Sequence, residues 1–261
     1  MGNGKAVMRA MPDGHEPMTD ASSPTVWRRY LPLAVILSGL GLFFALGGHR
    51  YVSFEVLRQH SEMLQAWVAA HMGLAMSAFF VAYAVVVTFS LPGGALMTMI
   101  GGFLFGTWIG GTIVVVAATL GASLIFLAAR SAFGDLLRAR AGPGLAKLEA
   151  GFRENAMSYL LVLRLVPLFP FFLVNLAPAF FGVPLRTYVV ATFIGIVPGT
   201  FVYAGVGNGL DAVFAAGGEP DFTIVYEPEI LVPLLALAAL ACLPIWYRRV
   251  MAARRRPPRA N

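Results

Sequence analysis

The sequence predicts an all-α polytopic membrane protein. It consists of an inverted repeat of re-entrant helical hairpin plus transmembrane helix, with flanking N- and C-terminal transmembrane helices. Of the 261 residues 58% are hydrophobic and only 12% are charged, whereas soluble domains carry about a quarter charged residues. Several apolar stretches reach the roughly 20 residues that a helix needs to cross a bilayer. Two other apolar stretches are interrupted by proline and glycine, which indicates hairpins rather than plain membrane anchors.

The net charge of +6 comes from basic residues at the two ends of the apolar region. Clusters of this kind set membrane orientation and contact anionic lipid headgroups, so both termini are expected on the cytoplasmic side of the cell inner membrane. A nucleic-acid partner is not expected, because no recognition module accompanies the charge. The basic residues before the first apolar stretch and after the last are Lys5, Arg9, Arg28, Arg29, Arg248, Arg249, Arg254, Arg255, Arg256 and Arg259.

The N-terminal region precedes the repeat. Residues 1–29 are predicted to form a disordered cytoplasmic tail, and residues 30–48 are predicted to form the first transmembrane helix. Arg28 and Arg29 before this helix also resemble a signal peptide, but residues 45–47 (ALG) make a weak cleavage site, so we expect an uncleaved helix. Residues 49–65 have amphipathic spacing that fits an interfacial helix and a soluble linker helix equally well.

The core is expected at residues 70–210. Its parts are a hairpin at 71–106, a helix at 108–130, a cytoplasmic loop at 131–157, a hairpin at 158–182 and a helix at 187–207. An external loop at 208–229, a last transmembrane helix at 230–247 and a basic cytoplasmic tail at 248–261 follow. The external loop carries acidic and no basic residues, which is typical of the outer face.

The parity of membrane crossings predicts the hairpins. The N-terminus, residues 131–157 and the C-terminus are all basic, so an even number of crossings must separate each from the next. The helices at 187–207 and 230–247 already supply two, and residues 158–182 therefore cannot cross once. Parity leaves a pair of crossings open for residues 71–106, but residues 91–106 are short for a crossing and begin with Pro92. We prefer a hairpin that enters from outside.

The two hairpins occupy corresponding positions in the repeat. Residues 101–106 (GGFLFG) and 177–182 (APAFFG) both lie just before a crossing helix, one half entering from outside and the other from inside. Broken helices at corresponding places of two inverted halves point to a transport site near the bilayer midplane.

The second hairpin carries the residues predicted for substrate binding or translocation, which are Arg164, Pro167, Pro170 and Asn175. A guanidinium in an apolar hairpin suits a phosphate or carboxylate, because it offers five donors in a planar fork. The alternative is an arginine that extends to the cytoplasmic interface and only anchors the hairpin. Asn175 fits a hydrogen bond across the hairpin and a contact with a headgroup equally well.

Glycine and proline are expected to form the hairpin turns and the close helix contacts. Pro92, Gly93 and Gly94, and in the second hairpin Pro167 and Pro170, predict turns, although such residues also kink straight helices. Spacing by four predicts faces where helix backbones approach closely. Residues in such runs are Gly102, Gly106 and Gly110, then Gly195 and Gly199 beside Pro198, and Gly205 and Gly209.

No enzyme, cofactor or metal site is expected. Acid–base pairs, nucleophile triads and phosphate loops do not occur as motifs in the sequence. The histidines are His15, His49, His60 and His71, none with ligand spacing, and the single cysteine is Cys242 in the last apolar stretch.

The motifs together resemble the SNARE-associated Golgi protein family, also called the DedA or VTT-domain superfamily, over roughly residues 70–210. The resemblance rests on GGFLFG at 101–106, LGA at 120–122, FLAAR at 126–130, LRLVPLFP at 163–170, Asn175, and GIVPGT at 195–200. It implies two opposed re-entrant hairpins, with Arg164 matching the arginine of the second hairpin that is associated with function.

The resemblance also implies a function. Members of the superfamily are implicated in moving lipids between leaflets, including the undecaprenyl phosphate carrier in bacteria, so a flippase or scramblase acting on anionic or phosphate headgroups is expected. Bacterial members often carry an acidic residue where this chain has Gly94, which favours passive or differently coupled movement. The alternatives are a transporter of small solutes or ions and a non-transporting membrane scaffold.

Overall fold

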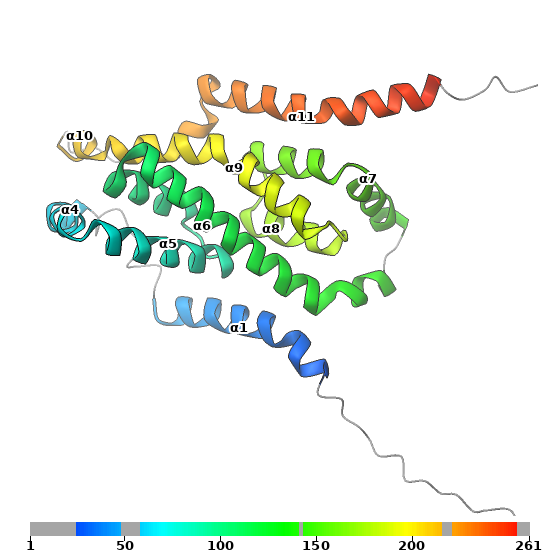
Figure 1. Cartoon of the computed structure of the whole chain (residues 1–261), viewed down its shortest axis with the longest axis horizontal. Coiled ribbons are helices and arrows are strands. Elements are labelled where there is room, and N and C mark those ends of the chain that lie inside the picture. The colour runs from blue at the N-terminus through cyan, green and yellow to red at the C-terminus, as the bar shows by residue number, and fades with distance from the viewer. Residues whose placement is uncertain (1–24, 48–57, 141–142, 216–220, 255–261) are drawn as a thin grey trace, which may run out of the picture.

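The computed structural model describes residues 25–47, 58–140, 143–215 and 221–254, and within these ranges the chain forms helices and no strand (Figure 1). The all-α class is confirmed. The elements are α1 (Thr25–Ala45), α4 (Ser61–Ala70), α5 (Met72–Thr88), α6 (Gly94–Arg140), α7 (Pro143–Leu165), α8 (Phe171–Phe180), α9 (Leu185–Asn208), α10 (Leu210–Ala215), the 3-10 helix η1 (Ile224–Tyr226) and α11 (Pro228–Arg254).

The first helical hairpin is formed by α5 and the beginning of α6. The chain turns between them at Ser90 (φ 50°) and Gly93 (φ 105°). A second reversal lies inside α6, where Gly106 has φ 78° and ψ 167° and divides the helix into segments 94–105 and 107–140. The segments then fold back on each other, since a Cβ at Gly110 would collide with the carbonyl of Gly101.

The second half repeats this order of elements. Helix α7 is interrupted at Asn155, so that residues 156–165 form a separate arm. The arm leads through a turn to the short helix α8, then to Gly182 (φ 67°), and then to the long helix α9. Gly106 and Gly182 thus hold the same place in the two halves, and both have a left-handed φ that glycine adopts without a Cβ clash.

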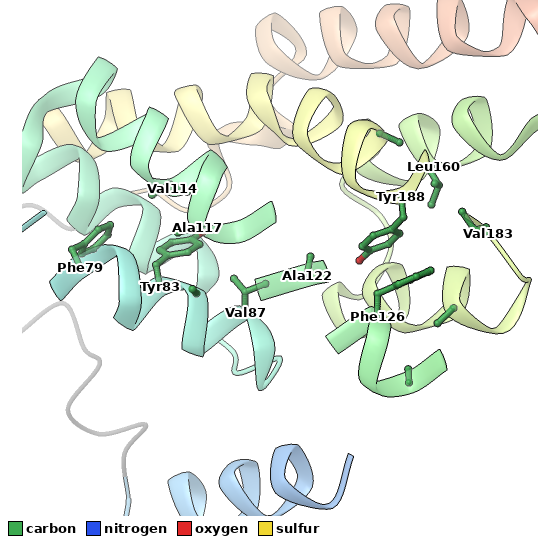
Figure 2. Packing of buried hydrophobic residues seen from close by; sticks show 14 of the residues in the cluster. Phe79, Tyr83, Val87, Val114, Ala117, Ala122, Phe126, Leu160, Val183 and Tyr188 are labelled. Carbon is green, nitrogen blue, oxygen red and sulfur yellow. The ribbon is translucent and has the colours of Figure 1, made fainter. Parts of the chain in front are cut away.

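The two long helices of the repeat, 107–140 of α6 and α9, run antiparallel. Near one end a Cβ at Gly111 would lie 2.9 Å from the Phe201 ring, and further along the Phe126 and Tyr188 rings stack with centroids 4.3 Å apart. Figure 2 shows this core, in which the stacked pair lies beside Leu160 and Val183. The halves therefore share one apolar core, with opposite chain directions.

Among the described residues, three helical stretches are long and apolar enough to cross a membrane: Gly94–Ala132, Leu185–Asn208 and Pro228–Trp246. A fourth exists if α4 and α5 count as one span, although they meet at a bend of 116°. The polytopic membrane class is confirmed. The apolar stretch found in α1, Leu33–Leu42, is shorter than a span, so the first crossing at 30–48 stays a prediction.

The connecting segments differ from the prediction. The loop expected at 131–157 is largely helical, because α6 continues to Arg140 and α7 begins at Pro143, and its alanine, leucine and arginine residues are good helix formers. The segment 208–229 contains α10 and η1, and α11 extends to Arg254 into the expected basic tail. The expected tail at 1–29 lies outside the described residues up to residue 24, as do residues 48–57 of the expected interfacial helix.

Candidate functional site

A cavity of about 430 Å³ lies where the turns of the two hairpins meet. Ser90 to Gly94 line it from the first turn, and Pro167 lines it from the second. Arg164 at the end of α7 contributes a charged side chain, and Thr200 and Tyr203 of α9 also line the cavity. Segments more than 70 positions apart in the sequence are thus combined in one partly polar cavity.

Arg164 is held by three neutral side chains of the second half. Its guanidinium donates hydrogen bonds of 2.8 Å to Asn175 Oδ1, 2.9 Å to the Tyr188 hydroxyl and 3.1 Å to Thr192 Oγ1. The centre of the guanidinium also lies 5.5 Å from the centroid of the Tyr188 ring, within the range of a cation–π interaction. Asn175, Tyr188 and Thr192 are all buried, so the arginine is fixed by elements α7, α8 and α9 together.

The charge of Arg164 has no counter-ion within the described residues. Its hydrogen-bond partners are an amide and two hydroxyls, and no described carboxylate forms an ion pair with it. An arginine side chain stays protonated in proteins, and neutral dipoles orient a cation without neutralising it. A half-buried cation in this setting favours an anionic ligand in the cavity that it lines.

Buried donors next to this charge are unsatisfied within the described residues. Arg164 Nε and Asn175 Nδ2 have no hydrogen-bond partner, and neither does the hydroxyl of Ser90 in the first turn. Because an arginine only donates, it must face the carbonyl oxygen of Asn175, and this leaves the amide nitrogen free. A buried polar group without a hydrogen-bond partner costs about 1–3 kcal/mol of free energy. Binding of a ligand whose acceptor atoms reached these donors would therefore be favoured.

Two further contacts shape the site. Gly195 of α9 lies against Arg164, and a Cβ there would be 2.6 Å from Arg164 Cβ. In the first hairpin the Tyr83 hydroxyl and Thr98 Oγ1 are 2.9 Å apart, and Thr98 Oγ1 donates to the Gly94 carbonyl at 2.8 Å. The first turn is thereby held by a buried tyrosine, as the arginine of the second hairpin is by Tyr188.

The prolines predicted for translocation occupy different positions. Pro167 lines the cavity, and its carbonyl accepts a 2.9 Å hydrogen bond from the Tyr226 hydroxyl. Pro170 immediately precedes α8, is exposed, and does not line the cavity. Pro92, Gly93 and Gly94 form the first turn and part of the cavity wall.

The prediction of close packing needs correction at the glycine runs. Gly102 does pack closely, since a Cβ there would collide with the Ala204 carbonyl. Gly106 is the helix break, so Gly102, Gly106 and Gly110 do not share one helix face. At Gly199 a Cβ would meet nothing within 4 Å, because this residue faces the cavity. Pro198 lies inside α9, and the cavity wall does not include it.

Two partners of Arg164 on α9, Tyr188 and Thr192, were not predicted as site residues. A signal was present, because the two residues are four positions apart on a mainly apolar helix and therefore share a face. The pattern alone does not say that this face meets an arginine from another helix.

The fold and the cavity define a polytopic helical membrane protein with two opposed hairpins around an arginine. Residues 91–209 match the family model of the VTT domain. The match covers a little under half of the chain, and over these residues it confirms the resemblance to VTT-domain proteins that the motifs predicted.

The relatives are named only as transmembrane proteins. The chain is 28% identical over 196 residues to Transmembrane protein 41 homolog of Dictyostelium discoideum, covering 74% of this chain and 57% of the relative. It is 28% identical over 176 residues to Transmembrane protein 41B of Mus musculus and 27% identical to that of Homo sapiens, each covering 66% of this chain and 58% of the relative. The chain thus spans a little over half the length of these relatives. No solved structure matches it.

Proposed function

We propose that the protein moves lipids with anionic or phosphate headgroups between the leaflets of a membrane, as a flippase or scramblase. The observation that carries this proposal is the charge of Arg164, which lines the cavity between the hairpin turns with only neutral partners among the described residues. The missing counter-ion would be the phosphate of the lipid.

The geometry suggests how a headgroup would be helped across. A charged group in the centre of a bilayer is costly unless it finds polar partners or water. Here the headgroup would meet the guanidinium, the unsatisfied Ser90 hydroxyl and the hydroxyls of Thr200 and Tyr203. The guanidinium is already oriented by its three partners, so little conformational entropy is lost when it binds an anion.

The composition of the cavity supports movement without proton coupling. The described wall carries no Asp or Glu side chain, and Gly94 stands where bacterial members often have an acid. A carboxylate is the usual proton carrier in such a transporter. We therefore propose passive or otherwise coupled transport. We also propose that the protein lies in the cell inner membrane with both termini cytoplasmic, because basic residues cluster at the two ends of the apolar region.

The test uses Arg164→Gln in proteoliposomes that contain a fluorescent phosphatidylglycerol, with its accessibility to an impermeant quencher as the readout. Because a hydrogen bond to a charged group contributes about 1.5–3 kcal/mol, we expect the rate to fall by about tenfold or more. The matched control is Arg186→Gln, at an exposed arginine in the first turn of α9, which should keep the wild-type rate.

Two outcomes would contradict the proposal. If Arg164→Gln, with wild-type thermal stability, moved the lipid as fast as wild type, the role of Arg164 would be wrong. Uptake of a soluble phosphate without lipid movement would instead support a solute transporter.

A further inference from the structure

A second hollow lies beside the cavity and is apolar throughout. It has a volume of about 460 Å³, and its wall combines Leu161 and Leu165 of α7, residues 193–195 and 197–198 of α9, and Leu237 and Ala241 of α11. None of the described residues that line it has an ionisable side chain. We call it the α9–α11 groove.

The groove adjoins the cavity that Arg164 lines. Leu165 lines both the cavity and the groove, and Gly195 of the groove is the residue that packs against Arg164 Cβ. On α11, Leu234 lines the cavity and Leu237 the groove, and residues three apart are neighbours on a helix face. Cavity and groove therefore follow one another along the same seam.

The seam faces outward in the part of the chain that would contact lipid. Helix α11 packs mainly on α7, with η1 at its beginning. Side chains of the groove are accordingly accessible, with Phe193 45%, Ile194 54% and Leu237 41% exposed. In a helix that crosses a bilayer, apolar side chains exposed to this degree are in contact with acyl chains.

We propose that the α9–α11 groove holds an acyl chain of the same lipid whose anionic headgroup meets Arg164. This inference rests on the proposed function and narrows the class of substrate. An apolar groove next to a cation fits an amphiphile, whereas a free phosphate would use only the cation and leave the groove empty. The occupant is thus a lipid with a full-length chain.

The physical role of the groove is to guide the chain rather than to supply affinity. An acyl chain that leaves the bilayer for the groove exchanges one apolar environment for another, so the hydrophobic effect contributes little. Headgroup selection then belongs to Arg164, while the groove lets the chain follow the headgroup. Filling the groove should slow movement and leave headgroup preference unchanged.

The first experiment compares Ala241→Phe with Ala239→Phe. Ala241 lines the groove, whereas Ala239, also on α11, is exposed and lines neither hollow. In proteoliposomes with long-chain phosphatidylglycerol, we expect Ala241→Phe to reduce the rate about fivefold, because the added ring would occupy space in the groove that the acyl chain needs. Ala239→Phe should stay near the wild-type rate. Equal rates for the two variants would overturn the groove while leaving the proposed function intact.

The second experiment uses the unaltered protein, so it does not depend on the folding of a variant. A phosphatidylglycerol with a photoreactive group on its acyl chain is irradiated with the protein, and the labelled peptides are mapped. We expect labelling of groove residues, among them Phe193, Ile194, Leu237 and Ala241, that excess unlabelled phosphatidylglycerol suppresses and phosphatidylcholine does not. Labelling that both lipids suppress equally would show bulk lipid only and overturn the inference, whether or not the protein moves lipid.

Discussion

The guanidinium of Arg164 and the side-chain oxygen of Asn175 form a 2.8 Å hydrogen bond between the two arms of one hairpin. Asn175 is fully buried, and its oxygen has a cation as its partner in place of water. The bond ties α7 to α8 across the turn that contains Pro167 and Pro170, and it orients the arginine toward the cavity. Stability of the hairpin and orientation of the charge therefore depend on the same pair.

Replacing Asn175 with aspartate should separate these two roles. Asn175→Asp keeps the size of the side chain and gives Arg164 a counter-ion, so we expect the thermal stability in detergent to be kept. The rate of anionic-lipid movement should fall by about tenfold, because a paired guanidinium loses its attraction for a second anion. Asn175→Ala is the comparison, and it should cost about 1–3 kcal/mol of stability by leaving a buried donor of Arg164 unpaired. Wild-type transport by Asn175→Asp would refute the counter-ion argument.

The contact between α6 and α9 predicts that alanine substitutions at two glycines differ in their effect on stability. A Cβ at Gly102 collides with the backbone carbonyl of Ala204, whereas at Gly199 it meets nothing within 4 Å. We expect Gly102→Ala to destabilise the fold by about 1–3 kcal/mol, since backbone cannot move aside as a flexible side chain does. Gly199→Ala should be neutral or stabilising by up to about 1 kcal/mol, because alanine is the better helix former. Thermal unfolding in detergent measures both, and a Gly102→Ala protein as stable as wild type would contradict the contact.

Gly182 predicts a cost that comes from the backbone alone. It has φ 67°, and a Cβ there would meet nothing within 4 Å, so crowding plays no part in the effect. Gly182→Ala should lose about 1–2 kcal/mol of unfolding free energy, the cost of a left-handed residue with a side chain. The control is Gly73→Ala in α5, which also has open space and has no positive φ. If the two variants lost the same stability, the left-handed turn before α9 would not be needed.

Several features of the fold could be predicted because they depend on local chemistry. Apolar runs of membrane-spanning length indicate helices whatever surrounds them. The boundaries were within a few residues at α9, whereas α11 continues past the expected end to Arg254. Proline and glycine at 92–94 indicate a turn because of their own backbone preferences. The structure of the segment between Arg130 and Pro143 was harder to predict. Its charges suggested a loop, whereas its good helix formers continue α6 to Arg140.

The candidate site could be predicted only in part. Arg164 was identifiable because a charge in an apolar stretch is costly, and Asn175 because it is a polar side chain in the same hairpin. Tyr188 and Thr192 were missed, and Gly199 was assigned to packing although it faces the cavity. Which face of α9 meets α7 depends on how whole helices pack, and the spacing of residues on one helix does not contain that information.

The sequence by itself determined that this is a helical membrane protein, that two hairpins interrupt its spans, and that Arg164 is the residue to explain. These conclusions follow from the free-energy cost of charged side chains and unpaired backbone groups in lipid. This cost applies to each segment by itself, whatever its neighbours are. Only the tertiary structure decided that the two turns meet in one cavity and that Arg164 has neutral partners among the described residues. It also decided that an apolar groove adjoins them. Such features are created by contacts between helices distant in the chain, where packing rather than local preference chooses the neighbour.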